Sequence, residues 1–151
     1  MITSRLKQLL EQSGVRYHGI PHLTAYRADH TALAAGLPSE EFAKTVLVKA
    51  DGRLCMVVLP ADHQVQLETL RRKLGAETLE LASELEVGQA FPDCETGAMP
   101  PFGRLYGMEV FVSPALRRGE QIAFNAGSHD EAVRMSYRDY ERLAQPRRLQ
   151  M

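Results

Sequence analysis

The stretch Thr45-Val46-Leu47-Val48-Lys49-Ala50-Asp51-Gly52-Arg53-Leu54-Cys55-Met56-Val57-Val58-Leu59 decides the fold class. Two runs of β-branched and apolar residues flank Asp51-Gly52, and an Asp-Gly pair in this position is a strong signal for a β-hairpin. The second run is apolar on both faces, so we expect it to lie centrally in a sheet that is covered on both sides.

Helical and strand patterns alternate on both sides of this hairpin. Apolar spacing and capping residues predict helices from residue 4 to residue 10, over 28–35, over 67–74, from Ser83-x-x-Glu86 to the residue before Pro92, and after Ser136-x-x-Asp139. A further helical turn is expected over 38–43. Strands are expected over 15–20, 78–81, 105–113, 121–125 and 132–135. At least one strand pair is antiparallel, which predicts a single mixed α+β domain of the α/β type rather than a purely parallel sheet.

Length and composition set the class of protein. With 151 residues and 44% hydrophobic content, the chain fits one domain over residues 1–144 and a flexible tail over 145–151. The formal net charge of −1 argues against a protein that binds DNA or long RNA along its length. Binding to one end of a nucleic acid is still compatible with this charge. No membrane span or signal peptide is apparent, and the two cysteines form no CxxC motif, so we expect a cytoplasmic protein.

Several kinds of catalytic site are excluded by missing motifs. The sequence contains no P-loop and no GxSxG nucleophile motif. Its five histidines form neither HxH nor HExxH, so we expect no metal and no cofactor.

The segment from Glu95 to Gly103 combines two prolines with two glycines. Pro100 and Pro101 fix their own φ angles, and the glycines adopt conformations that other residues avoid. We therefore expect a stiff loop in which backbone N–H groups near Gly97 point at a ligand. The alternative is an ordinary connecting turn.

Two other segments carry candidate functional groups. Lys44 is expected at the start of a strand, where its ammonium either extends to solvent or is held over a pocket to meet an oxyanion or a phosphate. The small and polar residues of 124–129 form either a turn or a pocket floor, in which Asn125 or His129 supplies a directional hydrogen bond.

Three motifs in this order resemble the YbaK/ProX (YbaK/EbsC) family of aminoacyl-tRNA editing domains. They are Ala43-Lys44-Thr45-Val46-Leu47-Val48, Gly97-Ala98-Met99-Pro100-Pro101-Phe102-Gly103 and Phe124-Asn125-Ala126-Gly127. The resemblance extends over nearly the whole chain. It implies a mixed, mostly antiparallel and partly barrel-like sheet packed by helices, in a free-standing editing protein rather than an insertion in a synthetase.

The resemblance also implies an activity and its residues. The activity is metal-independent hydrolysis of the ester between a wrongly attached amino acid and the 3′ end of a tRNA, with tRNA-Pro expected and prolyl-tRNA synthetase as a second partner. Lys44 is the expected functional side chain, and the Gly97–Pro101 loop contributes backbone groups. A water assisted by the ribose hydroxyl of the substrate is the expected nucleophile.

The remaining site residues follow from the same resemblance. The expected pocket for a small amino acid is shaped by Ala98, Met99, Pro100, Pro101, Asn125, Ala126, Gly127 and His129. Tyr26 and His22 are expected either to flank the terminal adenosine or to pack in the core. The two positions that indicate the substrate disagree, because Thr45 is typical of cysteine-directed members of the family, whereas Asn125 is not. The substrate amino acid therefore stays open among Cys, Ala, Ser, Thr and non-protein analogues. A non-catalytic module that binds a tRNA end or a synthetase, and a hydrolase for another small ester or amide, are the competing hypotheses.

Overall fold

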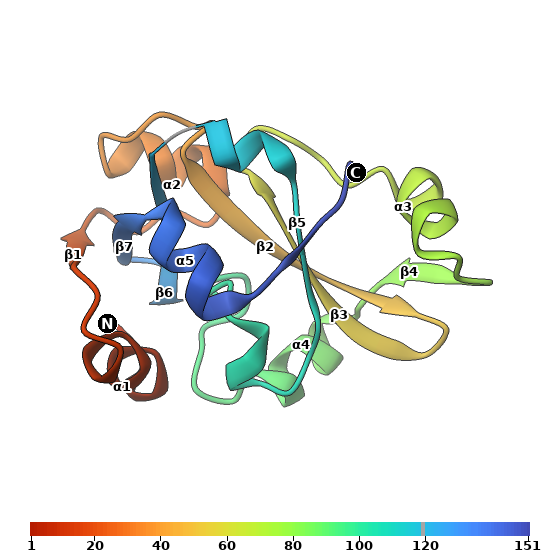
Figure 1. The fold of residues 1–151 in the computed structure, drawn as a ribbon. Coiled ribbons are helices and arrows are strands. Elements are labelled where there is room, and N and C mark those ends of the chain that lie inside the picture. Colours follow the sequence, from red (N-terminus) through yellow and green to blue (C-terminus); the bar gives the residue numbers. More distant parts are fainter. Residues whose placement is uncertain (119) are drawn as a thin grey trace.

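The fold is built around one mixed sheet, which a computed structural model of the chain describes for residues 1–118 and 120–151. Figure 1 shows the chain running from α1 at one end to a C-terminus beside β5. The strands are β1 (Tyr17–Pro21), β2 (Phe42–Ala50), β3 (Arg53–Pro60), β4 (Leu79–Leu81), β5 (Val110–Val112), β6 (Gln121–Ser128), β7 (Glu131–Ser136) and β8 (Arg147–Arg148). The helices are α1 (Ser4–Gln12), α2 (Ala28–Ala34), α3 (Leu67–Leu74), α4 (Glu84–Ala90) and α5 (Tyr137–Ala144).

The strand order in the sheet is β1-β7-β6-β2-β3-β5-β8, and β4 pairs with β2 outside this row. The β1/β7, β6/β7, β2/β3 and β2/β4 pairs are antiparallel, whereas β2/β6, β3/β5 and β5/β8 are short parallel pairs. The expected mixed, mostly antiparallel sheet in one α+β domain is therefore confirmed.

The β2–β3 hairpin forms at the predicted place. Asp51 and Gly52 have φ angles of +50° and +82°, as a tight two-residue hairpin turn requires. All of β3 after Leu54 is buried, which confirms its central position. The predicted capping box of α4 is also present, because Ser83 and Glu86 exchange side-chain and backbone hydrogen bonds of 3.0 and 3.1 Å.

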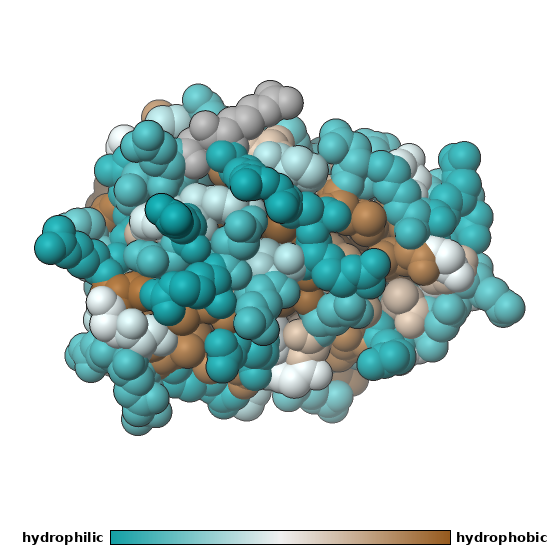
Figure 2. Space-filling model, viewed as in Figure 1, coloured by the Kyte–Doolittle hydropathy of each residue, from teal (hydrophilic) through white to brown (hydrophobic). Residues whose placement is uncertain are grey.

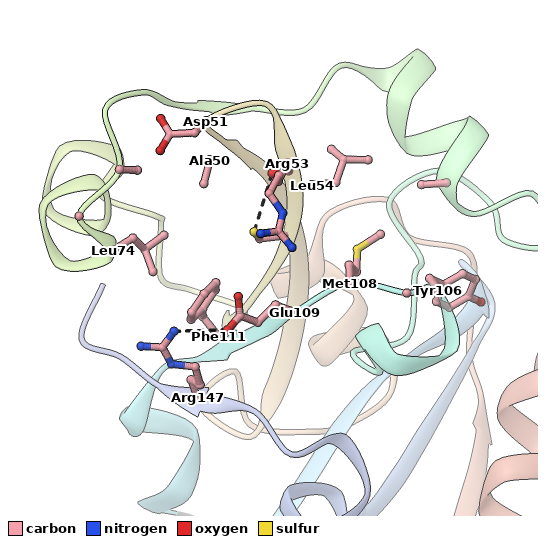
Figure 3. Close-up of a pocket in the computed structure, with 15 residues that line it drawn as sticks. Ala50, Asp51, Arg53, Leu54, Leu74, Tyr106, Met108, Glu109, Phe111 and Arg147 are labelled. Atoms are coloured by element: carbon pink, nitrogen blue, oxygen red, sulfur yellow. Dashed lines mark hydrogen bonds and ion pairs between the residues drawn. The ribbon is translucent and has the colours of Figure 1, made fainter.

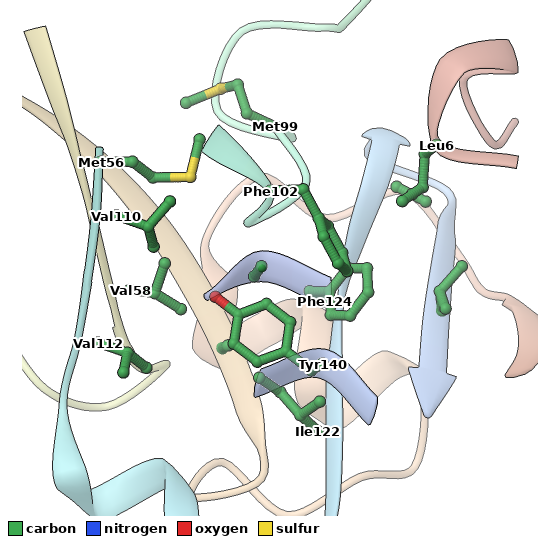
Figure 4. Close-up of a cluster of buried hydrophobic side chains, with 14 of the residues drawn as sticks. Leu6, Met56, Val58, Met99, Phe102, Val110, Val112, Ile122, Phe124 and Tyr140 are labelled. Carbon is green, nitrogen blue, oxygen red and sulfur yellow. The ribbon is translucent and has the colours of Figure 1, made fainter. Parts of the chain in front are cut away.

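Helices cover both faces of the sheet. Apolar residues of α1, α4 and α5 join the largest core cluster on one face, and Figure 4 shows Phe102, Phe124 and Tyr140 packed together at its centre. On the other face, Leu70 of α3 covers the β2–β3–β5 region and Ala32 of α2 covers the region around Phe42. Hydrophilic side chains occupy most of the surface seen in Figure 2.

Four predicted elements differ from the structure. Residues 38–41 form a turn rather than a helix, so β2 begins at Phe42 and Lys44 is its third residue instead of the residue before a strand. The strand expected over 105–113 covers only Val110–Val112, because Gly103–Leu105 forms a 3-10 turn. β6 extends three residues past Asn125. The tail expected to be flexible includes β8, which pairs with Phe111 and Val112 of β5.

Candidate functional site

A split between β2 and β6 creates the candidate site. The parallel register pairs Phe42 with Ala123 and Ala43 with Phe124, and it ends there. Further along β2, the edge that faced β6 is next paired at Leu47, whose carbonyl accepts a hydrogen bond from the Ala82 N–H. Lys44 and Asn125, the next residues along the two strands, therefore stand where the strands have separated.

A small cavity lies in this split. Its volume is about 20 Å³, which is close to the space that one water molecule needs. The residues that line it come from the segment before α2 and the start of α2, from β2, from the loop over residues 95–103 (the Pro/Gly loop) and from β6: Tyr26, Ala28, Phe42, Ala43, Lys44, Thr45, Gly97, Met99 and Asn125. The fold thus brings together three segments that sequence analysis had singled out separately.

Two polar atoms at this cavity are buried and lack partners within the described chain. They are the hydroxyl oxygen of Thr45 and the side-chain oxygen of Asn125, whose side chain is 8% exposed. A buried polar group without a hydrogen bond costs about 1–3 kcal/mol, so a ligand that supplies the missing bonds is favoured here.

Lys44 supplies the positive charge of the site. None of the ion pairs among the described residues includes Lys44. Partial burial lowers the pKa of its ammonium below that of an ordinary lysine, while the more distant Asp29 and Asp62 act in the opposite direction. An unpaired, partly desolvated ammonium binds an anionic group more strongly than a fully hydrated one does.

The Pro/Gly loop presents one backbone donor to the cavity. Glu95 to Ala98 form a β-turn closed by a 3.0 Å hydrogen bond from the Ala98 N–H to the Glu95 carbonyl. Gly97 has φ +90°, which identifies a type II turn with glycine at its third position. The Gly97 N–H donates to the sulfur of Met99 at 3.2 Å. Because a thioether is a weak acceptor, a carbonyl oxygen or an oxyanion would replace it readily.

Ala98, Ala126 and Gly127 lie behind the cavity rather than along it. The Glu95 N–H donates to the Gly127 carbonyl at 2.8 Å, and the Gly127 N–H donates to the Ala98 carbonyl at 2.9 Å. The β6/β7 register slips between Asn125 and Ser128, which places Ala126 and Gly127 in a bulge. At Gly127, with φ +119°, a Cβ atom would collide with the methyl group of Thr3. These residues hold the loop against β6.

The two prolines of the loop are part of its buried support. Pro100 and Pro101 are buried, and the Pro101 carbonyl accepts a 2.9 Å hydrogen bond from the hydroxyl of Tyr140 in α5. The following Phe102 is fully buried against the edges of aromatic rings in the main core cluster. Together with the Glu95–Gly127 hydrogen bond, these contacts anchor the loop on both sides of the Gly97 N–H.

His129, Tyr26 and His22 occupy three different positions. His129 is 4% exposed and lies behind Gly97, with its Nε2 2.7 Å from the Thr96 carbonyl oxygen. Tyr26 lines the cavity, is 77% exposed and has its ring centroid 4.9 Å from that of His129, so it does not pack in the core. His22 is outside the lining, and its Nδ1 lies 2.8 Å from the Leu23 carbonyl oxygen.

Sequence analysis did not place Thr45, or the apolar residues Ala28, Phe42 and Ala43, at the cavity. Thr45 appeared there as part of the Lys44 motif and as an indicator of the substrate amino acid, but not as a residue of the cavity. Its importance depends on the end of the β2/β6 pairing, and that pairing joins residues about 80 positions apart in the chain. A polar residue directly after Lys44 in an otherwise apolar strand is the one signal that the sequence offers.

A much larger hollow lies at the other end of β2. Figure 3 shows it between the hairpin, the end of α3, the loop before β5 and β8, and its volume is about 590 Å³. Its carboxylates have partners: Asp51 accepts from the N–H groups of Glu77 and Thr78, and Glu109 lies 3.3 Å from Arg147.

Two further observations concern the described residues alone. In residues 1–118 and 120–151, no helix has the length and apolar character needed to cross a membrane. The same residues contain no group of three or more His, Cys, Asp or Glu side chains arranged to hold a metal ion.

Comparisons with known proteins agree on one family. The family model for the aminoacyl-tRNA editing domain matches residues 22–143. The chain is 32% identical over 147 residues to the multifunctional Ser/Thr-tRNA deacylase ProXp-y of Escherichia coli strain K12, covering 94% of this chain and 87% of that protein. It is 30% identical over 102 residues to the proline–tRNA ligase of Bacillus licheniformis, covering 68% of this chain and 18% of the ligase. A solved structure of a proposed trans-editing enzyme for prolyl-tRNA synthetase shares the fold, with a TM-score of 0.82, 17% identity, and coverage of 97% of this chain and 93% of that one.

Proposed function

Because the chain belongs to the aminoacyl-tRNA editing family and is thereby a hydrolase of aminoacyl-tRNA esters, we propose that it acts as a free-standing deacylase of tRNA mischarged with a small amino acid. We place the reaction in the cytoplasm and take tRNA-Pro as the first tRNA to test. The relationship to a segment of proline–tRNA ligase supports that choice.

One observation carries the proposal. The cavity between β2 and β6 combines the ammonium of Lys44, a weakly bound backbone donor at Gly97 and two buried polar atoms, and neither that ammonium nor those two atoms have an ionic or hydrogen-bond partner among the described residues. These groups match the parts of an aminoacyl ester: a negatively charged tRNA end, a carbonyl that becomes an oxyanion, and an amino-acid side chain.

The proposed chemistry needs little beyond positioning. Water adds to the carbonyl carbon of the ester, and the tetrahedral oxyanion accepts a hydrogen bond from the Gly97 N–H. The C–O bond to the ribose then breaks, and a proton ends on the ribose oxygen, with the neighbouring ribose hydroxyl assisting the attack. One preorganised donor of this kind contributes on the order of 3 kcal/mol to the transition state. The anchored loop avoids the entropic cost of ordering that donor during the reaction.

Lys44 stabilises charge in this scheme and does not act as a base. Its ammonium neutralises either the oxyanion or the phosphate of the terminal nucleotide, and both roles require the charged form. The lowered pKa reflects partial burial of the ammonium.

Among small amino acids, we propose serine and threonine as the preferred substrates. A substrate hydroxyl can donate to the Asn125 oxygen and accept from the Thr45 hydroxyl, which satisfies both unpartnered atoms. A site built to hydrogen-bond a hydroxyl discriminates strongly against an analogue that lacks it. The name of the Escherichia coli relative, a Ser/Thr-tRNA deacylase, supports the same choice.

Tyr26 is proposed to contact the terminal adenosine. Its ring is exposed at the cavity, and stacking of a base on an aromatic side chain contributes about 1–3 kcal/mol. The cavity of about 20 Å³ must widen to admit a substrate side chain, and a swing of the exposed Tyr26 ring toward the base would widen it. His22, on the same connecting segment, is proposed as a secondary contact.

The decisive experiment measures hydrolysis of a panel of tRNAs. Purified protein, Lys44→Ala and Arg53→Ala are incubated with tRNA-Pro charged with Ser, Thr, Ala, Cys or Pro. Arg53 is an exposed arginine at the start of β3, paired across the hairpin with Ala50 at the end of β2, and serves as the matched control. Hydrolysis of Ser- and Thr-tRNA that is lost in Lys44→Ala and kept in Arg53→Ala is the expected result. Binding of tRNA without hydrolysis of any species would favour a non-catalytic module.

A further inference from the structure

His129 does not line the cavity, but it contacts the Pro/Gly loop through both its ring and its backbone. Its Nε2 lies 2.7 Å from the Thr96 carbonyl oxygen, and its backbone N–H donates to the Glu95 carboxylate at 3.4 Å. Its backbone carbonyl accepts from the Ala25 N–H at 3.3 Å, and its ring contacts Tyr26. His129 therefore joins the Pro/Gly loop to the segment that carries Tyr26.

The contact with Thr96 defines the state of the imidazole. A carbonyl oxygen only accepts hydrogen bonds, so Nε2 carries the proton in this contact. The other nitrogen, Nδ1, is buried and has no partner within the described chain, so no contact there calls for a second proton.

The Thr96 carbonyl and the Gly97 N–H are two ends of one peptide unit. Because that unit is planar and trans, the two groups point in opposite directions, and fixing one fixes the other. The His129 ring holds the carbonyl on one side, and the Gly97 N–H faces Met99 and the cavity on the other side.

This peptide unit is the one that rotates between two turn types. A type II turn has φ near +80° at its third residue and a type I turn has φ near −90°, and the two differ by a flip of the central peptide. Glycine tolerates both values, so Gly97 by itself does not select one. Gly97 is found at φ +90°, and its Cα lies against the imidazole, since a Cβ there would be 3.4 Å from Cε1 of His129.

We infer that His129 is a positioning residue that holds the Glu95–Ala98 turn in its type II form, and thereby aims the Gly97 N–H at the reacting carbonyl. This inference rests on the proposed deacylase function and assigns His129 no contact with the substrate. Without the Nε2 donor, the central peptide flips in nearly all molecules, and a flipped molecule presents a carbonyl where the oxyanion forms.

The test compares two replacements that differ in one property. His129→Phe keeps a flat ring and removes the donor, whereas His129→Gln keeps an N–H donor that can reach the Thr96 carbonyl. We expect kcat on Ser-tRNA to fall about 10²-fold in His129→Phe, as for loss of one oxyanion donor, with KM changed less than threefold. His129→Gln should stay within about fivefold of the wild type, and the exposed-histidine control His18→Phe should not change.

Equal loss of kcat in the Phe and Gln variants would overturn the inference, as would full activity of a folded His129→Phe. A second measurement uses the unmodified protein, so it does not depend on a variant folding. Nitrogen-15 NMR of the His129 ring should show a proton on Nε2 and a bare Nδ1 at neutral pH, and the opposite tautomer contradicts the inference. If the wild type hydrolyses no aminoacyl-tRNA, the proposed function fails, while the NMR result still decides the role of His129 in the turn.

Discussion

The two ends of β2 carry two very different hollows. At its start, the split from β6 leaves about 20 Å³, lined by Lys44, Thr45 and Asn125. At its end, the hairpin, α3 and β8 enclose about 590 Å³ (Figure 3). Of these two hollows, volume alone would favour the second as a binding site for a small molecule.

The state of the polar groups reverses that expectation. In the large hollow, the carboxylates of Asp51 and Glu109 already have partners. In the small cavity, two buried oxygens have no partner among the described residues, one ammonium is unpaired, and one N–H rests on a sulfur. In this comparison, unmet hydrogen-bonding capacity at a cavity is a better guide to a binding site than empty volume, because a molecule that enters the cavity can supply the missing bonds.

The largest effect should come from removing the charge in the small cavity. Lys44→Ala is expected to lower kcat/KM on Ser-tRNA about 100-fold or more, since it deletes the only cation among the described residues that line the cavity. Arg53→Ala, which removes an exposed cation from the large hollow, should leave kcat/KM within twofold. Comparable losses in both variants, measured by single-turnover deacylation, would remove the distinction between the two ends.

Gly97 tests the backbone donor and has a matched control in the hairpin. Gly97 and Gly52 have similar φ values, +90° and +82°, and a β-branched residue is strained at either. Gly97→Val and Gly52→Val should therefore lose similar stability, on the order of 1–2 kcal/mol. Only Gly97→Val should also lose activity, about 10- to 100-fold. Urea unfolding and deacylation rates separate the two effects, and equal activity in both variants would reduce the loop to a connecting turn.

Replacing Asn125 tests whether the unpartnered oxygens hydrogen-bond to a hydroxyl group of the substrate amino acid. Asn125→Leu is similar in size and removes the oxygen, so it should lower the ratio of Ser-tRNA to Ala-tRNA hydrolysis about tenfold. Because the replaced oxygen is buried without a partner in the described chain, the free energy of unfolding should stay the same or rise. An unchanged ratio of the two kcat/KM values would mean that Asn125 does not contact the amino acid.

The pH profile tests whether Lys44 acts as a cation. The active form carries the proton, and burial lowers the pKa, so activity should fall on the alkaline side with a midpoint below the ordinary lysine value of 10.5. Lys44→Arg, which keeps its charge to higher pH, should move this limit upward even if its maximum rate is lower. The rate of spontaneous ester hydrolysis is subtracted at each pH, and an alkaline limit that Lys44→Arg leaves in place would exclude Lys44 as its origin.

The smallest effects are expected in the large hollow. Glu109→Gln breaks an ion pair between side chains that are about half exposed, so it should change the free energy of unfolding by less than about 1 kcal/mol. Deacylation should not change. A clear loss of deacylase activity in this variant would show that a change at the large hollow affects the small cavity at the other end of β2.

Local signals predicted most of the elements. Asp51-Gly52 specified the hairpin, Gly75 ended α3 in the left-handed conformation, and Ser83 and Ser136 capped their helices as expected. Each of these features depends on residues only a few positions away in the chain, so it can be predicted from a single sequence.

The errors lie where distant pairing overrides local preference. β2 starts early because Phe42 pairs with Ala123, and β8 forms because β5 offers it an open edge. For the same reason, the resemblance located Lys44, Gly97 and Asn125, but neither it nor the pattern of residues could assign Thr45 to the cavity or His129 to the back of the turn. Those assignments depend on contacts between chain segments more than 30 residues apart, such as Thr96 with His129.

The two-residue contact between β2 and β6 also has a consequence for how the protein acquires activity. It closes a loop of about 80 residues, and contacts of such long sequence separation are slow to form. The hairpin can assemble early from local contacts, but the candidate cavity exists only once residues 42–45, 97–99 and 125 have met. Deacylase activity should therefore be the last signal to recover during refolding from denaturant, later than the return of secondary structure.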